Sequence, residues 1–211
     1  LIVSAMTDAY VAHGLQVPSR ARMLSVVGLS LPEAFQVLAD GDAAFPVQSM
    51  AAGYKSAFMR LRDIEPPEPM FPDAFQVLDA LRQRDDVMLG MVTGKARRGV
   101  DRVLAAQGME GWFATIQTAD DAPSKPHPGM VLQAMEEMGA RPEETVVVGD
   151  TSYDVTMALQ ARASAVGVTW GYHKREALLG AGAHLLVDRF TEVPGAALGL
   201  IAQRTAGADS L

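Results

Sequence analysis

Cysteine is absent from the 211-residue sequence. Its absence excludes disulfide bonds, thiolate catalysis and cysteine-ligated zinc, and it fits a reducing compartment. Long apolar runs are absent as well, since no stretch approaches the roughly 20 residues that cross a bilayer. The N-terminal residues also lack the basic and apolar regions of a signal peptide. We therefore expect a cytoplasmic protein that has no membrane partner.

Positive charge is scarce and dispersed. The 18 Lys and Arg residues are outnumbered by 25 Asp and Glu, which gives a net charge of −7. Nucleic acid is not an expected partner, because binding a phosphate backbone needs a clustered basic face. Hydrophobic residues make up 49% of the chain, which is ordinary for a globular protein of this size. The composition leaves open whether the protein is a monomer or a homodimer.

The first third of the sequence shows helical spacing of its apolar residues and no strong strand pattern. Ile2, Met6 and Tyr10 recur at helical intervals, and similar spacing returns later in this region. Glycines and prolines divide it into about four short helices. The proline-rich segment 65–69 reads as a stiff linker. We therefore predict a small all-helical domain over residues 1–65 and a second domain over residues 66–211.

The second domain alternates apolar runs with helical segments. Continuously apolar strands separated by helices indicate a parallel sheet that is covered on both faces. The predicted fold class is thus α/β, a doubly wound parallel sheet, with the final residues 202–211 frayed. The expected strands cover residues 87–92, 115–118, 145–148, 165–168 and 185–187.

Polar residues follow three of these strands, where open parallel sheets bind their ligands. Thr93 ends the first strand and is followed by Gly94 and Lys95. The Thr93 hydroxyl can donate a hydrogen bond, Gly94 lets the backbone approach a ligand closely, and the N-terminus of a following helix attracts negative charge, so this segment suits an oxyanion. Thr93 is therefore a candidate catalytic residue, and Gly94 and Lys95 are candidate substrate-binding residues. The alternative is that Thr93 is simply a helix N-cap.

The loop after the second strand carries Lys125 between turn-forming residues. A lysine held in this way can neutralise a phosphoryl group, whereas the alternative is a solvated loop lysine. His127 lies between two prolines, and a structural role in the turn is the better interpretation.

The third strand, Val146-Val147-Val148, leads into Gly149 and Asp150, and Asp154 follows one helical turn later. Asp150 is a candidate ligand for a hard cation such as Mg²⁺. Asp154 could orient Asp150, Lys125 or the water shell of the metal. The alternative is that both acids are favourable charges in the first turn of a helix.

Thr93 at a strand end, the turn Ser124-Lys125-Pro126 and the segment 149–154, in this order, resemble the haloacid dehalogenase superfamily. The chain is most similar to its phosphoglycolate phosphatase-type branch. The resemblance implies a Rossmann-type core and makes residues 1–63 a helical cap. It implies Mg²⁺-dependent hydrolysis of a small phosphorylated metabolite through an aspartyl-phosphate, with Asp150 as metal ligand and Thr93, Lys125 and Asp154 as catalytic residues. Mutase, phosphonatase and pyrophosphatase activities share these motifs and stay open.

The first motif of that superfamily, Asp-x-Asp-Gly-Thr after a central strand, does not occur in residues 1–211. Asp8 is no substitute, because it lies in a helical pattern. Without a central strand, neighbouring strands would keep unpaired backbone edges, so we expect about 15–20 further residues ahead of Leu1. The alternatives are a non-catalytic phosphate-binding regulator and a receiver-type signalling domain, although a receiver would place its acids before Thr93 and Lys125.

Overall fold

The computed structural model describes residues 1–62, 64 and 69–208, so most of the predicted linker lies outside the described residues. The chain divides into two compact units, Leu1–Pro69 and Met70–Leu211. The first is helical, with α1 (Ile2–Ala12), α2 (Arg20–Leu24), α3 (Leu31–Leu38) and α4 (Val47–Arg62).

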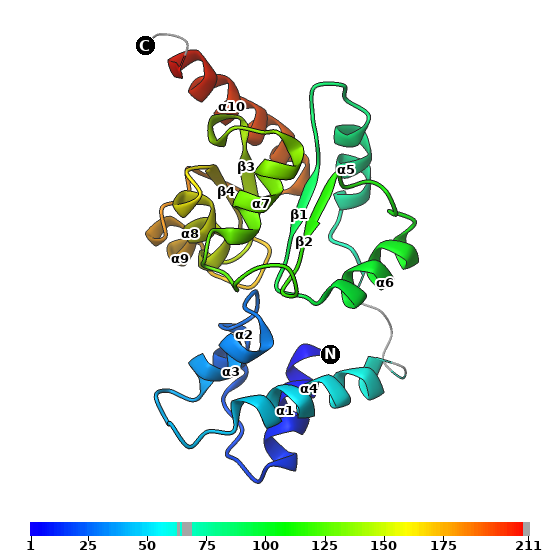
Figure 1. The fold of residues 1–211 in the computed structure, drawn as a ribbon, viewed down its shortest axis with the longest axis vertical. Coiled ribbons are helices and arrows are strands. Elements are labelled where there is room, and N and C mark those ends of the chain that lie inside the picture. Colours follow the sequence, from blue (N-terminus) through cyan, green and yellow to red (C-terminus); the bar gives the residue numbers. More distant parts are fainter. Residues whose placement is uncertain (63, 65–68, 209–211) are drawn as a thin grey trace. The chain divides into compact units, whose positions relative to one another are not determined.

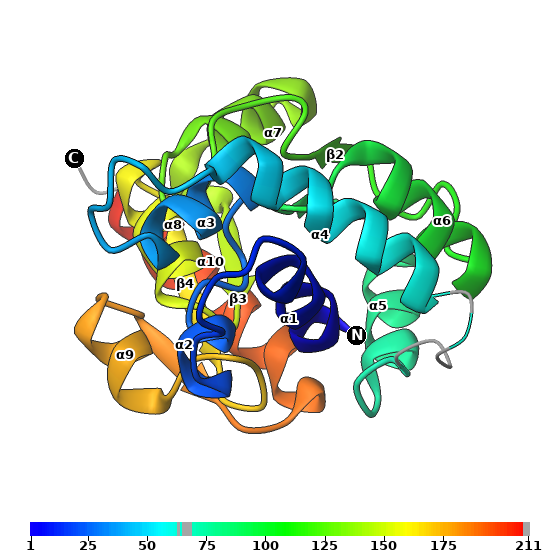
Figure 2. The same ribbon diagram turned by 90° about the horizontal axis from the view of Figure 1, so that it is seen from below.

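The helical unit is held together by α1 and α4, which lie side by side (Figures 1 and 2). Small residues allow this close approach, since a Cβ atom added at Gly53 would lie 3.2 Å from the ring of His13. Tyr10 packs near Phe35, with ring centroids 6.2 Å apart. The periodic apolar residues of the sequence therefore face one another in this core, as the helical spacing predicted.

The second unit alternates helices and strands (Figure 1). Its elements are α5 (Ala74–Arg82), β1 (Gly90–Val92), α6 (Arg97–Gln107), β2 (Thr115–Gln117), α7 (Gly129–Met138), η1 (Pro142–Glu144), β3 (Val146–Gly149), α8 (Ser152–Gln160), β4 (Ser164–Val168), α9 (Arg175–Gly180), β5 (Leu185–Val187), η2 (Phe190–Glu192) and α10 (Val193–Ala208).

All the strand pairs are parallel, as predicted. β1 pairs with β2 with Met91 opposite Ile116, and β4 lies between β3 and β5. Because successive strands run in the same direction, their carboxyl ends meet at one edge of the sheet. The loops after β1, β2 and β3 therefore carry the predicted site residues.

Strand β4 is buried on both faces, which explains its uninterrupted apolar sequence. Ala165 belongs to a core that α7, α8 and α9 complete, whereas Val166 and Val168 pack in a core with residues of α10. Val92 of β1 packs against the first of these cores, which also contains Val147 of β3. Strand β1 therefore shares a hydrophobic core with the β3–β5 strands, and the predicted α/β fold class is confirmed.

The strand pairing is nevertheless divided. Within the described residues, β1 and β2 form one sheet and β3, β4 and β5 form another, so β1 and β3 each keep one edge without a strand partner. Val148 in the middle of β3 is 40% exposed, although its apolar sequence predicted burial. A single continuous sheet is thus not observed, because no described strand joins β1 to β3.

Two element boundaries differ from the sequence prediction. Helix α6 begins at Arg97 rather than near Lys95, and a left-handed Gly108 ends it. The residues from Ala202 onward were expected to be frayed, but α10 continues to Ala208. Leu200, in the middle of this helix, is buried in the core with β4 and β5, which anchors the helix to the sheet.

Candidate functional site

The loop between β3 and α8 carries the two acidic residues. Thr151 is the N-cap of α8, and its hydroxyl accepts a hydrogen bond from Asp154 N. In return, the Asp154 carboxylate accepts hydrogen bonds from Thr151 N at 3.1 Å and Thr151 Oγ1 at 2.7 Å. This is a capping box, which satisfies the free N–H groups at the start of a helix. The interpretation of Asp154 as a first-turn charge is therefore correct, but it is incomplete.

Asp154 also forms a buried ion pair with Lys125. Lys125 Nζ lies 2.5 Å from Asp154 Oδ1, and each side chain is only 8% exposed. The pair joins the loop after β2 to the loop after β3. Lys125 is therefore not a solvated loop lysine, because its ammonium group is enclosed and its position is fixed by a carboxylate.

The pKa of Asp154 lies below its ordinary value. Burial is the largest influence and acts in the opposite direction, because it disfavours the charged form. The Lys125 ammonium and the hydrogen bonds from Lys125 and Thr151 together outweigh it. Asp154 is therefore ionised at neutral pH and serves as the counter-ion of Lys125.

Asp150 lies just outside α8 and makes different contacts. Its Oδ2 atom accepts a hydrogen bond from Tyr172 N at 2.9 Å, and its backbone carbonyl accepts one from His173 N at 3.1 Å. A Cβ atom added at Gly171 would lie 2.1 Å from Asp150 Cβ. Glycine is thus required at position 171 for the loop after β4 to approach Asp150 so closely.

Gly149 permits a second close approach. A Cβ atom added there would lie 2.3 Å from Asp154 Cβ. Glycine is therefore needed at position 149 for steric reasons, next to an acid that is needed for its chemistry. The two glycines 149 and 171 pack against the two acids, which restricts the positions that both carboxylates can take.

Thr93 follows β1, and its backbone N donates to Gln117 O at 3.0 Å. Its hydroxyl accepts a hydrogen bond from Lys95 N at 3.2 Å. Helix α6 begins four residues later, with Ala96 as its N-cap. The N-cap interpretation of Thr93 is therefore wrong, and so is the expectation that the helix starts directly after Gly94.

The structure joins some of the predicted residues and not others. Lys125 and Asp154 are in direct contact, whereas no hydrogen bond or ion pair among the described residues links Thr93 to Lys125 or Asp150. The lysine side chain at position 95 is exposed. His127 is also exposed and accepts a hydrogen bond from Gly129 N, which agrees with a structural role in the turn.

The sequence interpretation assigned no individual role to Thr151 or Gly171. The signal for Thr151 was present, because Thr-x-x-Asp before an apolar stretch is typical of a capping box. Gly171 had no such signal, since its contact with Asp150 depends on residues 21 positions apart and on the pairing of β3 with β4.

Metal binding by this chain would centre on Asp150. The described residues contain no group of three or more His, Asp or Glu side chains that could hold an ion. Mg²⁺ commonly takes one or two carboxylates and keeps several water molecules, so a single half-buried carboxylate fits part of such a site.

These features define a class of protein: a Rossmann-type α/β fold with a lysine–carboxylate site on the loops after its parallel strands. Residues 1–168 match the family described as haloacid dehalogenase-like hydrolase. The chain belongs to this family, and the resemblance drawn from its motifs is confirmed. No helix in the described residues is both long and apolar enough to span a membrane.

Several curated proteins are similar in sequence. The probable phosphatase IndB of Dickeya dadantii is 35% identical over 202 residues, which cover 95% of this chain and 87% of IndB. The pyrophosphatase PpaX of Bacillus pumilus is 32% identical over 163 residues, or 76% of this chain and 71% of PpaX. The phosphoglycolate phosphatase of Escherichia coli K12 is 36% identical over 110 residues, or 52% of this chain and 43% of that enzyme.

The fold also matches solved structures. A haloacid dehalogenase-like hydrolase from Bacteroides fragilis superimposes with a TM-score of 0.82, covering 91% of this chain and 90% of that one. Its sequence is 23% identical, so this likeness supports the fold alone.

Proposed function

We propose that the protein is a Mg²⁺-dependent phosphatase that hydrolyses a small phosphorylated metabolite of the phosphoglycolate type through an aspartyl-phosphate intermediate. The observation that carries this proposal is the buried Lys125–Asp154 ion pair, which joins the loop after β2 to the loop that holds Asp150. Phosphoryl transfer depends mainly on positioning and on neutralising charge, and a fixed buried ammonium group supplies both. The names of the similar phosphatases support the same reaction class.

Each residue has a distinct part in this proposal. The Thr93 hydroxyl, with the adjacent Gly94 and Lys95, binds the oxygens of the phosphoryl group. Lys125 neutralises negative charge on the phosphoryl group and on its acceptor, while Asp154 keeps the ammonium group in place. Asp150 is the metal ligand of this chain, and the bound Mg²⁺ would supply further neutralisation of the phosphate charge.

The proposed aspartyl-phosphate intermediate requires a nucleophilic aspartate. Asp8 is not a candidate in our proposal, because it lies in α1 and forms an ion pair with Arg60. We place the nucleophilic aspartate on a further strand that pairs between β1 and β3. The unpartnered edges of these two strands support this placement, since buried backbone N–H and C=O groups require hydrogen-bond partners.

The activity is tested with the native protein, including any residues ahead of Leu1, against a panel of phosphorylated compounds. The panel holds phosphoglycolate, pyrophosphate, β-glucose 1-phosphate and phosphonoacetaldehyde, each with Mg²⁺ or with EDTA. We expect Mg²⁺-dependent release of phosphate from the first. Preference for pyrophosphate would support the activity named for PpaX. Conversion of β-glucose 1-phosphate to glucose 6-phosphate would indicate a mutase, and cleavage of the C–P bond of phosphonoacetaldehyde would indicate a phosphonatase.

Two substitutions test the assigned residues. Thr93→Ala and Asp150→Asn should each lower turnover at least about tenfold, which corresponds to about 1.4 kcal/mol in the barrier. Asp101→Asn, at an exposed position of α6, is the control and should retain wild-type turnover. Wild-type rates in both test variants would refute the site assignment. Failure of the native protein to hydrolyse any substrate would refute the phosphatase and favour a non-catalytic phosphate-binding protein.

We also propose that the protein acts in the cytoplasm on a small-molecule substrate, as a monomer or a homodimer.

A further inference from the structure

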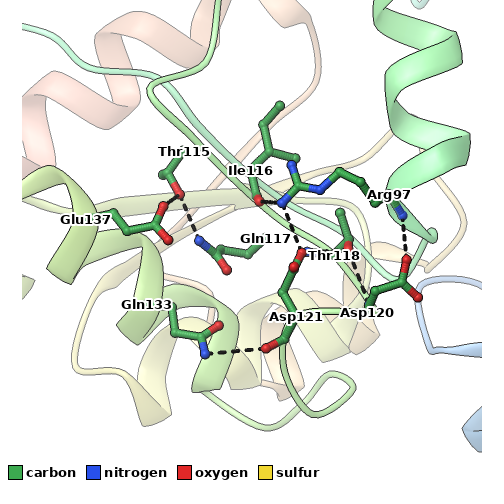
Figure 3. Close-up of polar contacts among 9 residues, drawn as sticks. All are labelled: Arg97, Thr115, Ile116, Gln117, Thr118, Asp120, Asp121, Gln133 and Glu137. Carbon is green, nitrogen blue, oxygen red and sulfur yellow. Dashed lines mark hydrogen bonds and ion pairs between the residues drawn. The ribbon is translucent and has the colours of Figure 1, made fainter.

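We propose that Arg97 is a positioning residue that ties the Thr93 turn to the loop carrying Lys125. The inference rests on the proposed phosphatase function, because it concerns the relative positions of the Thr93 hydroxyl and the Lys125 ammonium group in that site. Figure 3 shows Arg97 extending from the start of α6 toward the end of β2 and the loop that follows it.

The two loops are joined by backbone hydrogen bonds on either side of Thr93. Thr93 N donates to Gln117 O at 3.0 Å, and Ala119 N donates to Lys95 O at 3.1 Å. The first of these bonds continues the β1–β2 ladder by one residue, and the second lies beyond it. The Thr93 turn therefore runs alongside residues 117–119 before the chain reaches Lys125.

Arg97 closes this junction from the helix side. Its backbone N donates to Asp120 Oδ2 at 2.9 Å. Its Nη2 atom donates to Asp121 Oδ2 at 3.1 Å and to the backbone carbonyl of Ile116 (Figure 3). One residue thus contacts the backbone of β2 and two successive acids of the following loop.

Asp121 is held firmly on its own side of the junction. Its Oδ2 atom accepts hydrogen bonds from Thr118 N at 2.8 Å and Thr118 Oγ1 at 2.7 Å. Thr118 itself is fully buried. The hydrogen bond from the Thr118 hydroxyl is the main influence that lowers the pKa of Asp121, and the Arg97 charge lowers it further. The carboxylate is therefore ionised at neutral pH and fixed before Arg97 meets it.

The consequence concerns Lys125, which follows Asp121 by four residues. Its ammonium group is anchored at the far end of the loop by Asp154, and Arg97 anchors the near end. Loss of the Arg97 side-chain contacts would leave Asp121 held only from within its own loop, by Thr118, and would remove the side-chain link between this loop and the start of α6. Small displacements of groups that contact a reacting phosphate are costly, because catalysis depends on their orientation.

Hydrogen exchange tests the junction without reference to activity. In the full-length protein, Arg97→Ala should raise the exchange rates of the Thr93 and Ala119 amides about tenfold, while the amides of β4 keep their protection. Arg98→Ala is the matched control, since Arg98 is the exposed neighbour on the same helix. Unchanged exchange at both amides in Arg97→Ala would overturn the proposal.

A double-mutant cycle tests the positioning role. Arg97→Ala should lower kcat/KM for the best substrate about tenfold, and Arg98→Ala less than about twofold. In a Thr93→Ala background the Arg97→Ala loss should shrink to about twofold, because the residue that Arg97 positions is already gone. An equal loss in both backgrounds would show a merely structural effect and overturn the inference. If the wild-type protein has no turnover, the proposed function fails, and the exchange result alone then decides whether Arg97 joins the loops.

Discussion

Removal of one partner of the Lys125–Asp154 pair should destabilise the α/β unit strongly. The two atoms lie 2.5 Å apart, and both side chains are 8% exposed. Breaking such a buried pair costs about 3–5 kcal/mol, because the remaining charge is left unpaired in a poorly solvated position. Asp154→Asn keeps an oxygen that can still accept a hydrogen bond from Thr151, so we expect the lower end, about 3 kcal/mol.

Urea unfolding followed by tryptophan fluorescence measures this loss. Both tryptophans of the chain, Trp112 and Trp170, lie in the unit Met70–Leu211, so the signal reports on the unit that holds the pair. With a slope of about 2 kcal/mol per molar urea, a loss of about 3 kcal/mol lowers the midpoint by about 1.5 M.

The control is Asp79→Asn, which removes the exposed ion pair with Arg82 in the same unit. Exposed pairs contribute little, so its midpoint should move by less than about 0.3 M. An Asp154→Asn midpoint no lower than that of Asp79→Asn would refute the reasoning. A second variant separates charge from packing: Lys125→Met combined with Asp154→Asn removes both charges, and it should lose at least about 1 kcal/mol less than the sum of the two single substitutions.

Two further predictions concern the acids. Gly171→Ala would place a Cβ atom 2.1 Å from Asp150 Cβ and should lower turnover at least about tenfold in a phosphatase assay, whereas Gly99→Ala, with no atom within 4 Å, should leave it unchanged. The pKa of Asp154 is lowered on folding, so its contribution to stability is complete above the unfolded value of 3.8 and is lost as pH falls through the lower folded value. The difference between the urea midpoints of the wild type and Asp154→Asn should therefore begin to shrink as the pH falls below 3.8, and a constant difference down to pH 2 would contradict the assignment.

The alternation of helices and strands, and the polar residues at the strand ends, could be predicted from the sequence. Apolar strand segments and helix-ending glycines are local signals, and Gly108 and Gly139 are left-handed C-caps as the patterns indicate. Lys125 and Asp154 were both recognisable from their turn and helix contexts. Their contact was one of several possibilities, because it joins residues 29 positions apart.

Most features that could not be predicted from the sequence depend on pairing between strands that are far apart in the chain. The division of the strands between two sheets is a property of register and partner choice, and β1 carries only three residues to specify it. In the sequence, nothing distinguishes Arg97 from other charged residues at the start of a helix. Its role depends on the β1–β2 register, which brings the loop after β2 alongside the start of α6.

The ion pairs Lys125–Asp154 and Arg97–Asp121 differ in burial. The first therefore contributes to the stability of the unit, and the second to the alignment of the two loops. Lys125–Asp154 is enclosed, so salt screens it weakly and its loss is felt by the whole unit. Arg97–Asp121 has side chains that are 40% and 33% exposed, so its electrostatic contribution to folding is small and screened. The geometry of Arg97 is nevertheless specific, because one guanidinium nitrogen contacts both a backbone carbonyl and a carboxylate. The exposed pair can therefore govern where the Thr93 turn lies relative to the Lys125 loop while adding little to the free energy of unfolding.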